Sequence, residues 1–182
     1  MTGGLAKRYA RALVGAAKEE GRLEEVSDEL AQAASWLEDR ELSEALASPA
    51  LTQENRSALV SQMTESLGLS PLTRRFLDLI TERQRLAAFG GMQRAYTEMV
   101  DRELNRLRAV VRSAAPLTDE QVNSLSIALE ERHGKKVLLS TEVDPDLVAG
   151  ITVEIEGKTY DGSARTQLAR VARTLSRGGS IG

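Results

Sequence analysis

Apolar residues recur at helical spacing through the first part of the chain, and they are densest near its start. In residues 5–21 one face of a helix is apolar at positions i, i+4, i+7, i+8 and i+11; it consists of Leu5, Tyr9, Ala12, Leu13 and Ala16. A second, smaller apolar strip lies beside it and is made of Ala6, Ala10, Val14 and Ala17. Gly21 predicts the end of the helix, because glycine adopts the left-handed backbone that closes many helices. The helix is therefore apolar over more of its circumference than one core contact requires.

Two interpretations of this surplus apolar surface are open. The helix is either a central core helix surrounded by its own chain, or it packs on its core with one side and receives a partner helix on the other. The segment that begins at Ser70-Pro71 raises the same question, because it also has more apolar surface than one core contact needs. Its apolar side consists of Leu72, Phe76, Leu79 and Ile80, with Leu77 on a second edge.

Helical periodicity predicts six helices before residue 108. Thr52 and Ser70 are suited to begin helices, whereas Gly68 and the pair Gly90-Gly91 are expected to end them. The connections are short, which is typical of an antiparallel bundle. The expected helices cover residues 5–21, 22–38, 41–47, 53–67, 71 to before the glycine pair, and 92–107.

The apolar period changes near residue 108. Residues 151–155 alternate apolar and polar side chains with period two, which predicts a half-buried strand. Thr118 and Gln121 form a capping box that predicts a helix over 119–133. Further strands are expected at 109–111 and 136–143, and a last helix at 164–176. The predicted fold is thus mainly α, with a six-helix bundle over residues 1–107 and a small α+β domain over residues 108–182.

Composition excludes several classes of function. Aromatic residues make up only 3% of the chain, so the core must be aliphatic and few rings are present to stack on bases. A net charge of −3 argues against a dedicated nucleic-acid binder. The chain has no cysteine, which excludes disulfides and thiolate chemistry. We expect no membrane span and no signal peptide, since no apolar run approaches about 20 residues and a helix begins directly after Gly4.

Candidate catalytic and metal-binding residues are few. His133 is predicted at a helix C-terminus, where a cation meets the negative end of the helix dipole, and this local role is favoured over catalysis. Asp144, Asp146 and Asp161 are acids that suit a divalent metal, but turn and capping roles explain them more simply. Ser163 lies outside any nucleophile-elbow motif. We therefore expect no enzyme activity, no cofactor and no metal, although a cluster of Asp144, Asp161 and His133 would reopen that question.

The arginines have two interpretations. Most alternate with Glu and Asp along predicted helices, which is typical of solvated faces. In a second hypothesis, Arg74 and Arg75 help to bind an acidic segment. An alternative function, a regulatory or RNA-associated helical protein, would use these arginines and would bind nucleic acid in a salt-dependent way.

Six segments, taken in order, resemble the delta subunit of bacterial and chloroplast F-type ATP synthases, whose mitochondrial counterpart is the oligomycin-sensitivity-conferring protein. Each segment alone is a weak signal, but their order and spacing extend over nearly the whole chain. One departure is Val148-Ala149-Gly150, where Ile-Gly-Gly is common in that family. The segments are AKRYARAL at 6–13, SPAL at 48–51, FLDL at 76–79 with Arg85-Leu86, VRSAAPL at 111–117, VDPDLVAG at 143–150 and DGS at 161–163.

The resemblance implies a non-catalytic stator adaptor that resists rotary torque during proton-driven ATP synthesis. The helical domain would sit on the catalytic head, and the groove between its first and fifth helices would bind the N-terminal helix of an alpha subunit. The second domain would bind the C-terminus of the b subunit. The chain would lie at the cytoplasmic face of a bacterial membrane and associate with it only through the complex. By resemblance, the residues at or behind the groove are Tyr9, Ala12, Leu13, Ala16, Phe76, Leu79 and Ile80.

Overall fold

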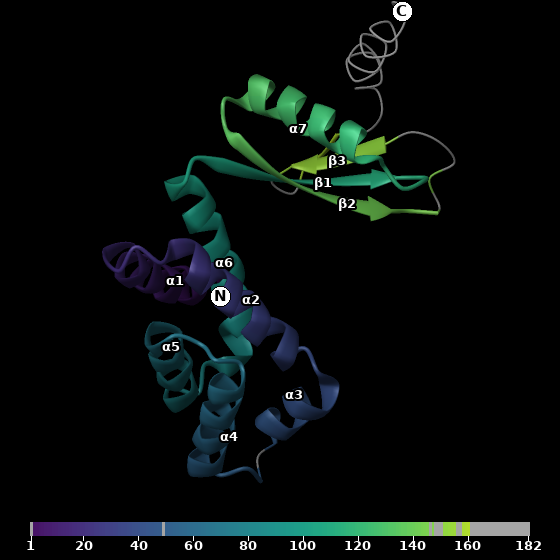
Figure 1. Cartoon of the computed structure of the whole chain (residues 1–182). Helices are drawn as coiled ribbons and strands as arrows, with labels where there is room; N and C mark the ends of the chain where they lie inside the picture. Colours follow the sequence, from purple (N-terminus) through teal and green to yellow (C-terminus); the bar gives the residue numbers. More distant parts are fainter. Residues whose placement is uncertain (1, 49, 146, 148–150, 156–157, 161–182) are drawn as a thin grey trace, which may run out of the picture. The chain divides into compact units, whose positions relative to one another are not determined.

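The computed structural model describes residues 2–48, 50–145, 147, 151–155 and 158–160 (Figure 1). The chain divides into two compact units, the first ending at Val100 and the second beginning at Asp101, somewhat before the boundary expected at 107/108. The first unit is helical, and the second combines a helix with a sheet. The predicted fold class, a helical bundle followed by a small α+β unit, is confirmed.

The first unit is built from six α-helices, the last of which continues three residues past Val100. Three of them begin at side-chain caps, because Asp39, Thr52 and Ser70 each accept a hydrogen bond from the backbone three residues further on. The core of the unit is aliphatic, with Tyr96 and Phe89 as its largest fully buried side chains. The helices are α1 (Thr2–Glu19), α2 (Leu23–Leu37), α3 (Arg40–Ala47), α4 (Gln53–Ser66), α5 (Pro71–Glu82) and α6 (Phe89–Glu103).

The glycine pair Gly90-Gly91 does not end a helix, so that prediction was wrong. The break lies earlier, where Gln84 has a φ of +54° and a short 3-10 turn, η1 (Leu86–Ala88), follows. Both glycines lie inside α6. A Cβ built at Gly91 would lie 3.5 Å from the Cβ of Ala6, so the glycine marks a close approach of α6 to α1. Packing between these two helices therefore outweighs the low helix propensity of glycine.

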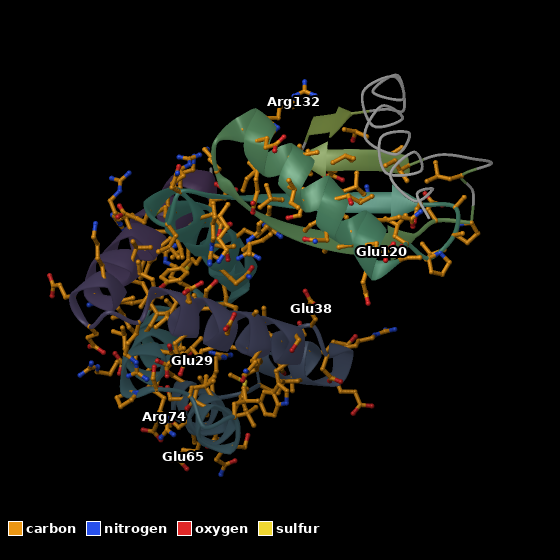
Figure 2. All side chains as sticks on the ribbon, turned by 45° about the horizontal axis from the view of Figure 1, so that its top comes forward. Glu29, Glu38, Glu65, Arg74, Glu120 and Arg132 are labelled. Carbon is orange, nitrogen blue, oxygen red and sulfur yellow. The ribbon has the colours of Figure 1, made fainter. Side chains whose placement is uncertain are left out.

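A buried carboxylate fixes the start of α5 against α2. Glu29 is 8% exposed and accepts hydrogen bonds from the backbone N–H of Ser70 and from the Ser70 hydroxyl, both at 2.7 Å. The Thr73 hydroxyl also donates to Glu29. The Glu29 carboxylate thus lies at the positive end of the α5 dipole. It accepts hydrogen bonds from backbone and side-chain donors at the start of α5. Figure 2 shows Glu29 within the first unit, whereas Glu65 lies at its surface.

The second unit contains a four-stranded mixed sheet with the strand order β2-β1-β3-β4. Strand β1 (Arg106–Ser113) pairs in parallel with β2 (Lys136–Val143) and antiparallel with β3 (Ile151–Ile155), which in turn pairs with β4 (Lys158–Tyr160). Helix α7 (Asp119–His133) connects the two parallel strands and lies over one face of the sheet (Figure 1). Leu125 and Leu129 of α7 pack on the apolar side chains of that face.

The predicted elements of this unit are largely observed. The capping box of Thr118 and Gln121 forms in both directions, and Gly134 closes α7 with a φ of +64°. Strand β1 begins at Arg106, three residues before the expected start, and α6 ends at Glu103 rather than at 107. The predicted helix at 164–176 lies outside the described residues.

An ion pair explains the early end of α6. Asp101 accepts hydrogen bonds from the guanidinium Nε of Arg106 at 2.6 Å and of Arg108 at 2.7 Å. Asn105 lies between Asp101 and Arg106 in the sequence and has a φ of +48°, which ends the helical backbone. The last turn of α6 is thereby held against the start of β1.

Removing the Glu29 carboxylate is expected to destabilise the first unit. Glu29→Ala leaves two hydroxyls and one N–H without their acceptor, so we expect the free energy of unfolding to fall by about 2–4 kcal/mol. Urea titration followed by the fluorescence of Trp36 measures this, because the single tryptophan packs against the core of this unit. Glu65→Ala, at an exposed position of α4, is the control and should change stability by less than about 0.5 kcal/mol. Equal losses for the two variants would contradict the role of Glu29.

Candidate partner-binding surface

Helix α1 buries its smaller apolar strip and leaves much of the larger one at the surface. The buried side chains are Ala6, Ala10, Leu13, Val14 and Ala17. In the predicted larger face, Leu13 is buried, Leu5, Tyr9 and Ala16 are half-buried, and Ala12 is exposed. The chain therefore does not surround this helix, so the fully enclosed core helix that was one interpretation is not observed.

Helix α5 is covered more completely. Phe76 and Ile80 are buried in the core of the first unit and lie behind the surface, whereas Leu79 is 41% exposed. Of the three α5 residues predicted for the site, only Leu79 has an exposed side chain. Side chains four residues apart lie on the same side of a helix, so Arg75, Leu79 and Arg83 form one exposed row.

One end of α1 contacts α5, and the other end contacts α6. Near the C-terminal end of α1, the Glu20 carboxylate lies 3.8 Å from the Arg75 guanidinium of α5. Near its N-terminal end, Ala6 faces Gly91, shortly after α5 and η1 end. We call Leu5, Tyr9, Ala12 and Ala16 of α1, with Leu79 of α5, the open strip. Glu29 holds the start of α5 through its hydrogen bonds with Ser70. Sequence reasoning missed Glu29, although this acid lies beside the buried positions Val26 and Leu30 of α2.

Both helices of the open strip carry charged groups. The guanidinium of Arg8 lies 5.8 Å from the ring centroid of Tyr9, within cation–π range. Partial burial and the neighbouring Glu82 raise the pKa of Asp78, while a hydrogen bond with Ser61 and the charge of Arg74 act against this. The surface is therefore mixed in charge, with cations next to its aromatic and apolar side chains.

The two arginines predicted to bind an acidic segment differ in their availability. The Arg74 Nε donates a hydrogen bond to the carbonyl of Leu69 at 2.7 Å, so Arg74 supports the turn before α5 (Figure 2). Arg75 is exposed and faces Glu20 at the longer distance of 3.8 Å. Of the two arginines, Arg75 therefore remains the candidate for binding an acidic segment.

The candidates for chemistry do not come together in the described residues. His133 is the last residue of α7, as predicted. Asp144 follows β2, and its N–H donates to the carbonyl of Ser113 at 2.9 Å. Asp146, Asp161 and Ser163 lie outside the described residues, and within the part described no group of three acidic or histidine side chains is placed to hold a metal ion. No helix of the described part has the length and apolar character needed to cross a membrane.

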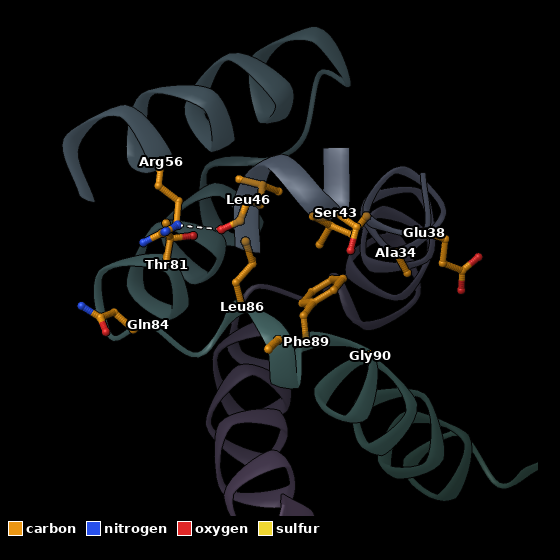
Figure 3. A pocket seen from close by; sticks show the side chains of 12 residues that line it. Ala34, Glu38, Ser43, Leu46, Arg56, Thr81, Gln84, Leu86, Phe89 and Gly90 are labelled. Carbon is orange, nitrogen blue, oxygen red and sulfur yellow. Dashed lines mark hydrogen bonds between the residues drawn. The ribbon is translucent and has the colours of Figure 1, made fainter. Parts of the chain in front are cut away.

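A hollow of about 370 Å³ lies between α2, α3, α4, α5, η1 and the start of α6 (Figure 3). Leu46, Leu86 and Phe89 give it an apolar lining. Arg56 also lines it, but its guanidinium donates to the carbonyls of Leu46, Ser48 and Leu51 and so holds the chain after α3. Sequence reasoning did not indicate this hollow, because its residues come from separate elements whose packing leaves no local signal.

A helical bundle with an uncovered apolar strip, followed by a small α+β unit, defines a protein-binding adaptor. The family model described as ATP synthase delta (OSCP) subunit matches residues 5–175. An ATP synthase subunit delta of Citrifermentans bemidjiense is 36% identical over 178 residues, which are 97% of this chain and 99% of that protein. One of Myxococcus xanthus is 35% identical over 176 residues, which are 95% of this chain and 97% of that protein.

A solved structure supports the same assignment. A chain in the cryo-EM structure of the Toxoplasma gondii mitochondrial ATP synthase hexamer matches with a TM-score of 0.70 and 25% identity, over 94% of this chain and 97% of that chain. The chain described here belongs to the ATP synthase delta (OSCP) subunit family. The resemblance inferred from the sequence is confirmed, and the comparisons support the role of a stator adaptor in an F-type ATP synthase.

The raised pKa of Asp78 predicts a pH-dependent effect on stability. Folding disfavours the ionised carboxylate, so its cost is present at neutral pH and is lost as the pH falls towards the unfolded value of about 3.9. Asp78→Asn should therefore raise the free energy of unfolding at pH 7, by less than about 1 kcal/mol because solvent screens this partly exposed group.

The gain from Asp78→Asn should shrink as the pH is lowered from 7 to about 4, measured by urea titration with Trp36 fluorescence. A gain of constant size over that range would show that the charge of Asp78 is not its cause.

Proposed function

We propose that this chain connects the catalytic head of an F-type ATP synthase to its peripheral stalk and performs no catalysis itself. The first unit binds the N-terminal helix of an alpha subunit at the open strip, and the second unit binds the C-terminal end of the b subunit. The chain is a peripheral component at the cytoplasmic face of a bacterial membrane, which it reaches through the complex. Family membership supports this role, and so does the open strip.

The observation that carries head binding is the division of apolar side chains on α1. The helix covers its core contact with alanines, Leu13 and Val14, and it keeps Leu5 and Tyr9 partly accessible. A partner helix laid along such a strip buries on the order of several hundred Å² on each side, at about 25 cal/mol per Å². Association entropy offsets much of this gain. Helices that are already packed lose little further entropy on binding, so more of the gain remains as affinity.

A subunit that resists torque needs rigid binding sites rather than reactive groups. Rotation of the central stalk would carry the catalytic head with it unless a static connection opposes the torque. Glu29 fixes α5 before any partner arrives, so little ordering remains to be done on binding. In the second unit, Ile127 and Val143 are 48% and 52% exposed, which supports a second apolar contact there.

Ala12→Asp tests the head-binding surface without disturbing the fold, because Ala12 is exposed in the free chain. A partner helix would have to remove water from the new carboxylate, so affinity for a peptide of the alpha N-terminal helix should fall at least about tenfold. Isothermal titration calorimetry measures the affinity, and circular dichroism checks the fold.

Ala58→Asp is the matched control, since Ala58 is an exposed alanine on α4 outside the open strip. Its affinity for the peptide should equal that of the unmodified chain. Unchanged binding by a folded Ala12→Asp variant would refute the proposed surface.

A further inference from the structure

Three cations of α1 are exposed along the middle of the helix, namely Lys7, Arg8 and Arg11. They lie beyond its first turn, so the helix dipole has little effect on them. Of the three, Arg8 lies four residues before Ala12 and next to Tyr9, and it therefore flanks the open strip.

Several other arginines of this chain are paired with acids of the same chain. Arg40 lies 2.8 Å from Glu44, and Arg112 lies 2.9 Å from Glu142 and 2.8 Å from Glu154. Arg8 has no acidic partner among the residues described; its guanidinium lies over the Tyr9 ring instead. It is thus an exposed cation held beside the apolar strip.

The row on α5 repeats this arrangement. Leu79 is preceded by Arg75 and followed by Arg83, each four residues away and exposed. Arg75 already faces Glu20, whereas Arg83 meets no acid within the described ranges. Arg8 of α1 and Arg83 at the C-terminal cap of α5 are thus two cations beside the open strip that have no acidic partner among the residues described.

From this charge pattern we infer that the helix that occupies the open strip carries acidic side chains on the flank that meets Arg8 and Arg83. The inference rests on the proposed function, and it adds the chemistry by which the partner is selected. The apolar contacts hold the partner, while the two cations steer it and fix its orientation, since opposite charges across an interface favour one register over others. The acids Glu19 and Glu20 at the other end of α1 disfavour the reversed orientation.

The test compares two peptides on the full chain. One spans the N-terminal helix of the alpha subunit of the same ATP synthase, and in the other its Asp and Glu residues are replaced by Asn and Gln. Calorimetry should give weaker binding for the neutral peptide. The affinity of the acidic peptide should fall as salt is raised, because exposed charge pairs are screened beyond about 10 Å at 0.1 M ionic strength.

Arg8→Gln and Arg83→Gln then locate the effect. Each should weaken binding of the acidic peptide about two- to fivefold, the range for an exposed ion pair, and leave binding of the neutral peptide unchanged. Arg40→Gln, an exposed arginine of α3, is the control and should affect neither peptide. Both arginines of the site are exposed, so these variants should keep the fold, which circular dichroism verifies.

The outcomes separate the two proposals. If the unmodified chain binds neither peptide, the proposed head-binding surface is wrong and this inference falls with it. If it binds both peptides equally at all salt concentrations, or if both arginine variants bind like the control, the surface stands and the acidic recognition is overturned. A preference for the acidic peptide that Arg8→Gln and Arg83→Gln abolish would establish it.

Discussion

The hydrogen bonds that Glu29 accepts at the start of α5 are the constraint on which the first unit depends. A carboxylate that is 8% exposed is stable there because two hydroxyls and a backbone N–H replace its water. The same contacts determine where α5 begins and which of its sides faces the core. Phe76 and Ile80 then point inward and Leu79 outward. A single buried charge on α2 thereby sets the position of a surface on α5.

Helix α1 buries one of its apolar strips and leaves much of the other accessible. Three alanines, Leu13 and Val14 serve the interior, where Gly91 and Ala6 let α6 approach closely. Leu5 and Tyr9, by contrast, stay partly accessible although they are large apolar side chains. This accessible apolar surface accords with the family role, a stator adaptor in an F-type ATP synthase.

Local signals made much of the fold predictable from the sequence, and contacts between distant residues account for the rest. The Thr118 and Gln121 box and the Ser70 cap act within one turn, so they identify the starts of α7 and α5. The helix end predicted at Gly91 was wrong, because this glycine allows a close contact with Ala6, which is far away in the sequence. The site was predicted as a set of apolar residues. Helical spacing alone could not show that Leu13, Phe76 and Ile80 lie beneath the surface while Ala12 and Leu79 lie on it.

The central position of β1 has a consequence for the order of folding during synthesis. The strand pairs with β2 and β3, both of which follow it by way of α7 and later turns, so the sheet is incomplete until the ribosome has delivered residues beyond 150. The first unit closes with residues up to Val100 and needs no later strand. Nascent chains should thus complete their helical half first. Until β3 is synthesised, one edge of β1 stays unpaired and can pair wrongly with another chain.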